Sequence, residues 1–177
     1  IKYILSGAQS QKDLRAYPLD NSKINLLYIG RRNNIKGFDR VMEAFQQASS
    51  IRNDINLILI GAGSKIEGKN IYDIGFSNTP QNWYNSVDYV INANRKSYFD
   101  LSVIEALSAN AKIILDANFG HKFYLNKSSD ILTFDPNNRN SLRDILLYEI
   151  KKSVNNNFNR QLFLKELSDV KYFERFL

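Results

Sequence analysis

The stretch INLLYIGRRNNIKGFDRVMEAF, residues 24–45, decides the fold. Its first six residues form an apolar run that Gly30 ends, which is typical of a buried strand. Apolar residues then recur at helical spacing, so an amphipathic helix of about four turns is expected over 37–50. A buried strand that passes through a short loop into a helix is the first part of a β–α–β unit.

The rest of the chain repeats this alternation. Further strands are expected at 55–60, 70–75, 88–92, 112–115 and 131–134. Further helices are expected from Thr79-Pro80, over 101–110, over 140–152 and, after a turn at 155–157, over 158–177. Apolar strands that alternate with helices form a parallel sheet covered on both faces. We therefore predict one Rossmann-like α/β domain over 1–177, with its core at about 24–152 and C-terminal helices in 153–177.

Composition excludes several kinds of site. The 177 residues contain no cysteine and a single histidine, His121, which excludes disulfides, thiolate chemistry and multi-histidine metal sites. No apolar run approaches the roughly 20 residues that cross a bilayer. The formal net charge of +6 suits phosphates, nucleic acid or an anionic membrane surface. Because the basic residues are spread along the chain, they do not indicate a nucleic-acid stripe.

Ligands of such sheets bind in the loops that follow the strands. Here these loops are 30–36, 61–64, 75–78, 92–100 and 116–121. The first loop adds Arg31 and Lys36 to a glycine turn and a helix N-terminus, and this combination makes a cradle for a diphosphate. An ordinary solvated basic loop is the alternative, and the Gly-Lys-Ser/Thr ending of a P-loop is missing.

Two weaker motifs follow. Gly61 and Gly63 would let a ligand approach the backbone closely, although a plain turn explains them as well. Glu105 lies near the start of the helix after the fourth strand, where its carboxylate can accept two ribose hydroxyls or simply be stabilised by the helix dipole. Asp100 or Ser102 can likewise be no more than the N-cap of that helix.

Taken in this order, these segments resemble the C-terminal domain of the GT-B glycosyltransferases of family 4. The resemblance covers roughly residues 24–152. The loop at 30–37 has the family's Gly-Arg-x4-Lys-Gly spacing, and residues 57–63 look like its second strand and glycine turn. Residues 84–88 look like its tyrosine-to-aspartate step, and residues 99–107 resemble the second part of its Glu-x7-Glu motif.

The resemblance implies a role for individual residues. Arg31 and Lys36 match the pair that holds the donor's diphosphate and stabilises it during catalysis. Glu105 matches the glutamate that binds the nucleotide ribose. The loop at 75–76 matches the stretch that frames the base, and the amides near Leu101 and Ser102 would meet the phosphates or the sugar. The expected substrate-binding set is Gly30, Gly61, Gly63, Phe76, Ser97, Phe99, Asp100, Leu101, Ser102 and Glu105.

Two positions depart from the family pattern. The first glutamate of the motif, which touches the donor sugar in the family, falls on Ser97, and the usual glycine three residues later is Asp100. An aspartate near a diphosphate is repulsive unless it is capped, paired or turned toward sugar hydroxyls. Three interpretations stay open: Asp100 takes over the sugar contact, the donor differs, or the site is degenerate. The presence of Arg31, Lys36 and Glu105 favours the first two.

The resemblance implies retaining transfer of a hexose from a nucleotide diphosphate sugar to a glycan or lipid-linked acceptor, in surface polysaccharide synthesis. Cations of the protein would replace a metal, and no cofactor beyond the donor is expected. An N-terminal acceptor domain, absent from this chain, is the expected partner, and the chain alone is expected to be inactive. A cytoplasmic location is expected, with peripheral contact at the inner face of the membrane left open.

Other functions stay as alternatives. One is a degenerate, non-catalytic nucleotide-binding domain of the same fold. Another is an unrelated flavodoxin-like or Rossmann-like module, although no Gly-x-Gly-x-x-Gly follows the first strand, which speaks against a dinucleotide. A basic nucleic-acid module is the weakest alternative, and no nucleic-acid partner is expected.

Overall fold

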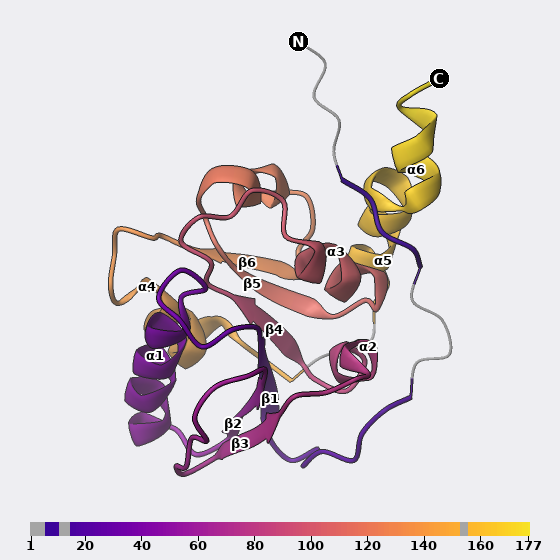
Figure 1. Cartoon of the computed structure of the whole chain (residues 1–177). Helices are drawn as coiled ribbons and strands as arrows, with labels where there is room; N and C mark the ends of the chain where they lie inside the picture. The colour runs from indigo at the N-terminus through magenta and orange to yellow at the C-terminus, as the bar shows by residue number, and fades with distance from the viewer. Residues whose placement is uncertain (1–5, 11–14, 153–155) are drawn as a thin grey trace.

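The computed structural model describes residues 6–10, 15–152 and 156–177, so 1–5, 11–14 and 153–155 of the predicted domain lie outside the described residues. A six-stranded sheet has the order β3-β2-β1-β4-β5-β6 (Figure 1). Its strands are β1 Ile24–Ile29, β2 Ile55–Ile60, β3 Ile71–Gly75, β4 Tyr89–Asn92, β5 Lys112–Asp116 and β6 Ile131–Phe134. Each neighbouring pair is parallel, which confirms the predicted Rossmann-like sheet.

Helices connect the strands and close the chain. They are α1 Phe38–Ile51, α2 Pro80–Tyr84, α3 Leu101–Ser108, α4 Ser141–Asp144, α5 Phe158–Leu162 and α6 Asp169–Glu174. A 3-10 helix, η1 Phe119–Tyr124, follows β5, and the π-helical turns η2 Ile145–Glu149 and η3 Phe163–Leu167 extend α4 and α5. Among the described residues, none of the helices combines the length and the apolar character of a membrane span.

The two faces of the sheet carry separate hydrophobic clusters, because successive side chains of a strand point to opposite sides. Leu26 of β1 belongs to the cluster that includes residues of α1 and α4. Its neighbour Leu27 belongs to the cluster that includes residues of α2, α3 and η3. Helices therefore cover both faces, as the apolar strands predicted (Figure 1).

Two of the predicted helices differ from the structure in their bounds. The helix expected over 140–152 ends at Glu149, after the π-helical turn of η2. The tail expected as one helix breaks at Ser168, which is extended and whose hydroxyl accepts a hydrogen bond from the Lys171 amide at 3.3 Å. That bond satisfies an amide of the first turn, so a new helix, α6, begins there.

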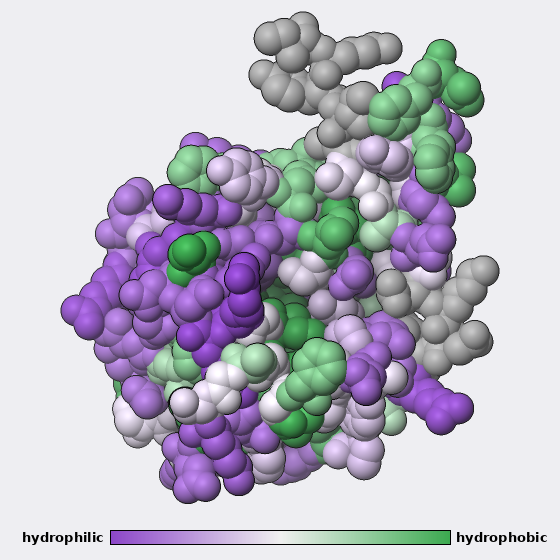
Figure 2. All heavy atoms as spheres, in the orientation of Figure 1, coloured by the Kyte–Doolittle hydropathy of each residue, from purple (hydrophilic) through white to green (hydrophobic). Residues whose placement is uncertain are grey.

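The N-terminal segment packs against the second face of the sheet. Tyr17 stacks on Trp83 of α2, with 4.1 Å between the ring centroids. Ala8 forms a parallel bridge with Ser168, close to the start of α6. Apolar side chains gather on α6 and toward the middle of the face seen in Figure 2, whereas the upper left of this face, above α1, is hydrophilic. Because of the bridge between Ala8 and Ser168, the first described residues of the chain lie beside the start of α6.

Candidate functional site

The predicted site residues lie in the loops at the carboxyl ends of β1 to β4 and at the start of α3. The strand order reverses between β1 and β4, and such a reversal is where Rossmann-like sheets bind their ligands. Phe76 and Leu101 are 77% and 56% exposed at this edge. The sequence therefore placed most of its candidates on one edge of the sheet.

The loop between β1 and α1 is held by its own chain. The Tyr28 hydroxyl donates to the carbonyl of Arg31 at 2.7 Å, and the Lys36 amide donates to the Asn33 side chain at 2.9 Å. Gly37 ends the loop with φ +67°, and a β-carbon there would lie 2.0 Å from the carbonyl oxygen of Ala93. Only glycine fits this position, because it needs both a left-handed backbone and close approach to the end of β4.

The two adjacent arginines of this loop have different surroundings. Arg32 forms a buried two-pronged ion pair with Asp73 of β3, with one Nη1–Oδ2 distance of 2.7 Å. Its hydrogen bonds lower the pKa of Asp73 to about 2, against the effect of burial. Arg31 is exposed, and within the described chain its side chain has no ion-pair or hydrogen-bond partner. Arg32 is therefore structural, and Arg31 is the arginine available to a ligand.

Gly61 and Gly63, which follow β2, pack against the loop between β1 and α1. A β-carbon on Gly61 would lie 2.1 Å from the carbonyl oxygen of Gly30, and one on Gly63 would lie 2.6 Å from the Arg32 side chain. Both positions therefore allow close approach within the protein. Close packing inside the protein therefore explains both glycines. This agrees with the alternative of a plain turn, which needs no ligand.

Three side chains converge at this edge of the sheet. They are Lys36 of the loop after β1, Asp100 at the start of α3 and His121 of η1. The Lys36 ammonium lies 3.2 Å from Asp100 Oδ1, and the Asn94 amide donates to both carboxylate oxygens at 3.0 and 3.1 Å. His121 Nε2 lies 3.0 Å from Asp100 Oδ2. The Asp100 carboxylate is thus paired. Pairing is one of the conditions under which an aspartate can lie near a diphosphate.

Asp100 also stands at the N-cap position of α3, but its side chain does not cap the helix. The amides of Leu101 and Ser102 consequently have no acceptor among the described residues. Free amides at a helix start carry partial positive charge and attract anions. Asp100 thus holds the N-cap position that the sequence suggested, but without a capping bond from its side chain, and the first two amides of α3 stay available.

Glu105 lies one turn further along α3 and is half-buried. Burial raises its pKa, and the Tyr84 hydroxyl donates to its Oε2 at 3.5 Å. Tyr84 ends α2, the helix that follows the exposed loop of Phe76. In the same helix, the indole N–H of Trp83 donates to the Ser77 hydroxyl at 3.1 Å. Glu105 and the Phe76 loop are thus linked through α2.

Ser97 and Phe99 turn inward. Ser97 is 1% exposed, and its hydroxyl lies 2.7 Å from Asn118 Oδ1, to which it donates. The Asn118 amide in turn donates to the carbonyl of Asn94 at 3.2 Å. Phe99 packs on Phe123, with 5.4 Å between the ring centroids. The predicted donor contact of Ser97 is corrected accordingly, because its side chain is buried beneath the loop. Phe99 is half-buried, and its donor contact stays a prediction.

Sequence reasoning missed the residues that join these loops: Asn94, Asp116, Asn118 and His121. Their loops were expected at this edge, but spacing along the chain does not show which side chains meet. Gly120 is the one local signal, since a β-carbon there would lie 1.2 Å from the carbonyl oxygen of Tyr98. The loop after β5 therefore crosses directly against the loop after β4.

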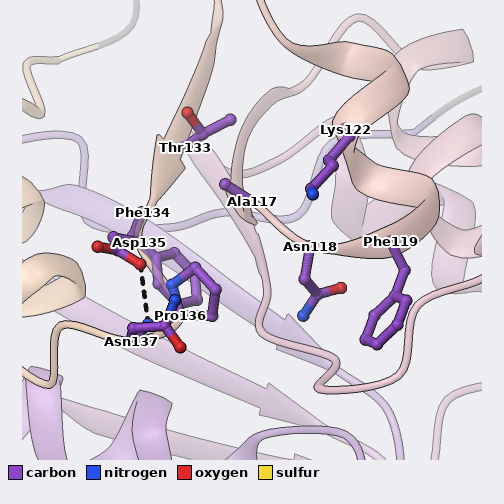
Figure 3. A pocket seen from close by; sticks show the side chains of 9 residues that line it. All are labelled: Ala117, Asn118, Phe119, Lys122, Thr133, Phe134, Asp135, Pro136 and Asn137. Atoms are coloured by element: carbon purple, nitrogen blue, oxygen red, sulfur yellow. Dashed lines mark hydrogen bonds between the residues drawn. The ribbon is translucent and has the colours of Figure 1, made fainter.

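A hollow of about 490 Å³ adjoins this crossing, between the ends of β5 and β6. Figure 3 shows Asn118 and Lys122 on one side of it, and Asp135 with Asn137 on the other. Arg31, Lys36 and Glu105 do not line it. Across the described ranges, no three histidine or acidic side chains gather closely enough to hold a metal ion.

Comparison with known proteins bears on the family and on the fold. A family model described as glycosyl transferases group 1 matches residues 23–150. A search of curated proteins found no match.

Several solved structures share the fold. TarM of S. aureus, in complex with fondaparinux, alpha-GlcNAc-glycerol and UDP, is 17% identical, with a TM-score of 0.72 over 99% of this chain and 37% of that one. The lipopolysaccharide outer core galactosyltransferase WaaB is 15% identical, with a TM-score of 0.77 over 99% and 54%. Anabaena Alr3699/HepE, in complex with UDP and glucose, is 12% identical, with a TM-score of 0.69 over 88% and 47%. The chain thus spans about half or less of each of these proteins.

Proposed function

This chain belongs to the group 1 glycosyltransferases, and from that premise we propose that it is the donor-binding half of a retaining enzyme. The donor would be a nucleoside diphosphate hexose. UDP occupies two of the similar structures, TarM and HepE, which supports this class of ligand. A separate N-terminal domain would bind the acceptor, in keeping with the share of its relatives that this chain covers.

One observation carries the proposal: the edge of the sheet holds positive groups that the protein leaves available. Arg31 is exposed and unpaired among the described side chains, and the amides of Leu101 and Ser102 lack acceptors there. Lys36 is one-third exposed and contacts Asp100, the residue at the N-cap position of α3. A diphosphate placed among these groups would receive charge-assisted hydrogen bonds from a side chain and from a helix start.

The remaining contacts divide between the two ends of the donor. Glu105 would accept hydroxyls of the ribose, and the exposed Phe76 loop would frame the base. Asp100 would take over the sugar contact that the family's first glutamate makes, since Ser97 is buried and Asp100 lies three residues further along the same loop. Because this carboxylate would lie at another position than the family's first glutamate, the site would suit a donor sugar whose hydroxyl groups are arranged differently.

The chemistry follows from the charges. Negative charge builds on the diphosphate as the glycosidic bond breaks, and fixed cations and helix amides stabilise it most when water is excluded. Arg31 and Lys36 would supply that charge in place of a metal. The second domain would close the cleft and deliver the acceptor, a glycan or a lipid-linked sugar of surface polysaccharide synthesis. The net charge of +6 suits work beside an anionic membrane surface.

Calorimetric titration of this chain with UDP, GDP, ADP, CMP and pyrophosphate tests the proposal. Selective binding of one nucleoside diphosphate supports a donor site and identifies the base. No binding of any of them by the folded chain overturns the proposal and favours a degenerate domain of the same fold. The observation that keeps this second candidate is that a buried serine, Ser97, occupies the position of the family's first glutamate, so that no carboxylate is present there.

A further inference from the structure

His121 is a buried side chain whose two ring nitrogens both face oxygen atoms. Its exposed fraction is 0%. Nδ1 lies 3.0 Å from the backbone carbonyl oxygen of Asp116, and Nε2 lies 3.0 Å from Asp100 Oδ2. A carbonyl oxygen only accepts hydrogen bonds, so Nδ1 carries a hydrogen.

The charge of Asp100 decides the state of the other nitrogen. Burial alone would raise the pKa of Asp100, but the hydrogen bond from His121, the charge of Lys36 and the hydrogen bond from Asn94 lower it to about 2. At neutral pH this side chain is a carboxylate and also only accepts. Nε2 therefore also faces an oxygen that only accepts, so the geometry favours a ring that donates from both of its nitrogens.

The surroundings of His121 suit a positive charge. Asp100 faces it from the start of α3 and Asp116 from the end of β5, while the Tyr124 ring centroid lies 6.4 Å away. Arg40 of α1 pairs with the carboxylate of Asp116, and Lys36 lies on the far oxygen of Asp100. A buried cation is costly unless it is paired and hydrogen-bonded, and both of its N–H groups are satisfied here.

From this geometry we infer that His121 is an imidazolium, and that it is a positioning residue that leaves the charge of Lys36 available to the donor diphosphate. This inference rests on the proposed donor site. Lys36, Asp100 and His121 carry two positive charges and one negative charge, so the array keeps one net positive charge. If His121 were neutral, Asp100 would cancel Lys36, and an incoming diphosphate would meet a neutral pair beside Arg31.

Nitrogen-15 NMR tests the charge without any ligand. The chain has a single histidine, so one imidazole gives all of the ring signals. Both ring nitrogens of the unliganded chain are expected to be protonated at pH 7, and Asp100→Asn is expected to release one of these protons. A neutral imidazole in the unsubstituted chain at pH 7 overturns the inference.

Pyrophosphate titration tests the consequence for the ligand. His121→Gln is expected to weaken pyrophosphate binding roughly tenfold, as expected when about 1.4 kcal/mol of attraction is lost. The double variant His121→Gln with Asp100→Asn restores the net charge and is expected to recover most of this loss. Lys165→Gln, which removes an exposed charge on η3, is the matched control and is expected to change the affinity less than about twofold.

The outcomes separate the two proposals. A double variant that stays as weak as His121→Gln shows a merely structural role and overturns the inference. Should His121→Gln fail to fold, Asp100→Asn alone decides, because it removes one negative charge while His121 releases one proton, so the array keeps its net positive charge. Pyrophosphate affinity is then expected to change less than about twofold, whereas clearly tighter binding by Asp100→Asn shows that His121 was already neutral and overturns the inference. An unsubstituted chain that binds neither pyrophosphate nor any nucleotide overturns the donor site and the role of Lys36, whereas the NMR result still decides the charge of His121.

Discussion

Lys36 and Asp100 meet at 3.2 Å across 64 positions of sequence, one from the loop after β1 and the other from the start of α3. The contact joins the two segments on either side of the point where the strand order reverses. It also places a carboxylate against the lysine that the family resemblance assigns to the diphosphate.

The neighbours Arg31 and Arg32 should separate binding from stability. Arg31→Ala is expected to weaken nucleoside diphosphate binding by about 1–3 kcal/mol, because one charged hydrogen-bond donor is lost, and to leave the free energy of unfolding unchanged. Arg32→Ala is expected to lower the free energy of unfolding by about 3–5 kcal/mol, because Asp73 stays buried without a partner. Calorimetry and urea denaturation measure the two effects, and a stability loss in Arg31→Ala contradicts the assignment.

Glu105→Gln should distinguish ligands by their ribose. The substitution is expected to weaken binding of the nucleoside diphosphate and to leave pyrophosphate binding nearly unchanged, because only the former offers ribose hydroxyls. Stability should not fall, since burial already raises the pKa of Glu105 and thus opposes its charge. Titration with both ligands measures the contrast. Equal losses would sink the assignment of Glu105 to the ribose.

Ser97→Glu should not restore the family's sugar contact. The new carboxylate would be buried against Asn118, and we expect the free energy of unfolding to fall by several kcal/mol, on the order of 3. Ser97→Ala is the milder comparison, with an expected loss of about 1 kcal/mol from the missing hydrogen bond. Urea denaturation of both variants measures this, and a Ser97→Glu chain as stable as the original would show that position 97 reaches solvent.

Two glycines with similar backbone angles form a matched pair. Gly37 has φ +67° and a β-carbon there would meet the carbonyl of Ala93, whereas Gly75 has φ +73° and open space around it. Gly75→Ala is expected to cost about 1 kcal/mol from the left-handed backbone alone. Gly37→Ala is expected to cost clearly more, because the end of β4 must also shift. Thermal unfolding of the two variants compares them, and equal losses would show that the loop adapts freely.

A fall in pH should lower the free energy of unfolding through protonation of Asp73 and Asp100. Both carboxyls have a pKa of about 2 in the folded chain, below the usual 3.8. A lowered folded-state pKa adds stability above the unfolded pKa, and that stability is lost as the pH falls through the folded pKa. The free energy of unfolding is therefore expected to fall from about pH 4 to about pH 2. Asp73→Asn should be less stable at pH 7 and show a shallower fall, which urea denaturation at each pH measures.

Much of the fold could be predicted from the sequence, because buried parallel strands are marked by continuous apolar runs between glycines. Strands β1, β2 and β6 have the predicted bounds, and the others differ by one residue at an end. The 3-10 helix η1 was missed because it has no helical periodicity and begins at Phe119, with φ +35°. The break at Ser168 depends on one side-chain hydrogen bond inside an otherwise helical pattern.

The candidate site was predicted less completely. Motif spacing placed Arg31, Lys36 and Glu105 at the edge formed by the carboxyl ends of the strands, and all three lie there in the structure. It did not show that Ser97 is buried, because the partner that buries it, Asn118, comes from another loop. Nor did it show that the lone histidine would contact Asp100, since that contact joins residues that share no motif.

Trp83 gives the molecule a built-in optical probe. It is the only tryptophan of the chain, its ring stacks on Tyr17, and its N–H is bound to Ser77, the residue after Phe76. Any ligand that moves the loop of Phe76 must therefore disturb the surroundings of a single fluorophore. Emission from this one side chain would report occupancy of the base end of the cleft without a label, and it would stay silent for a ligand that touches only the phosphate end.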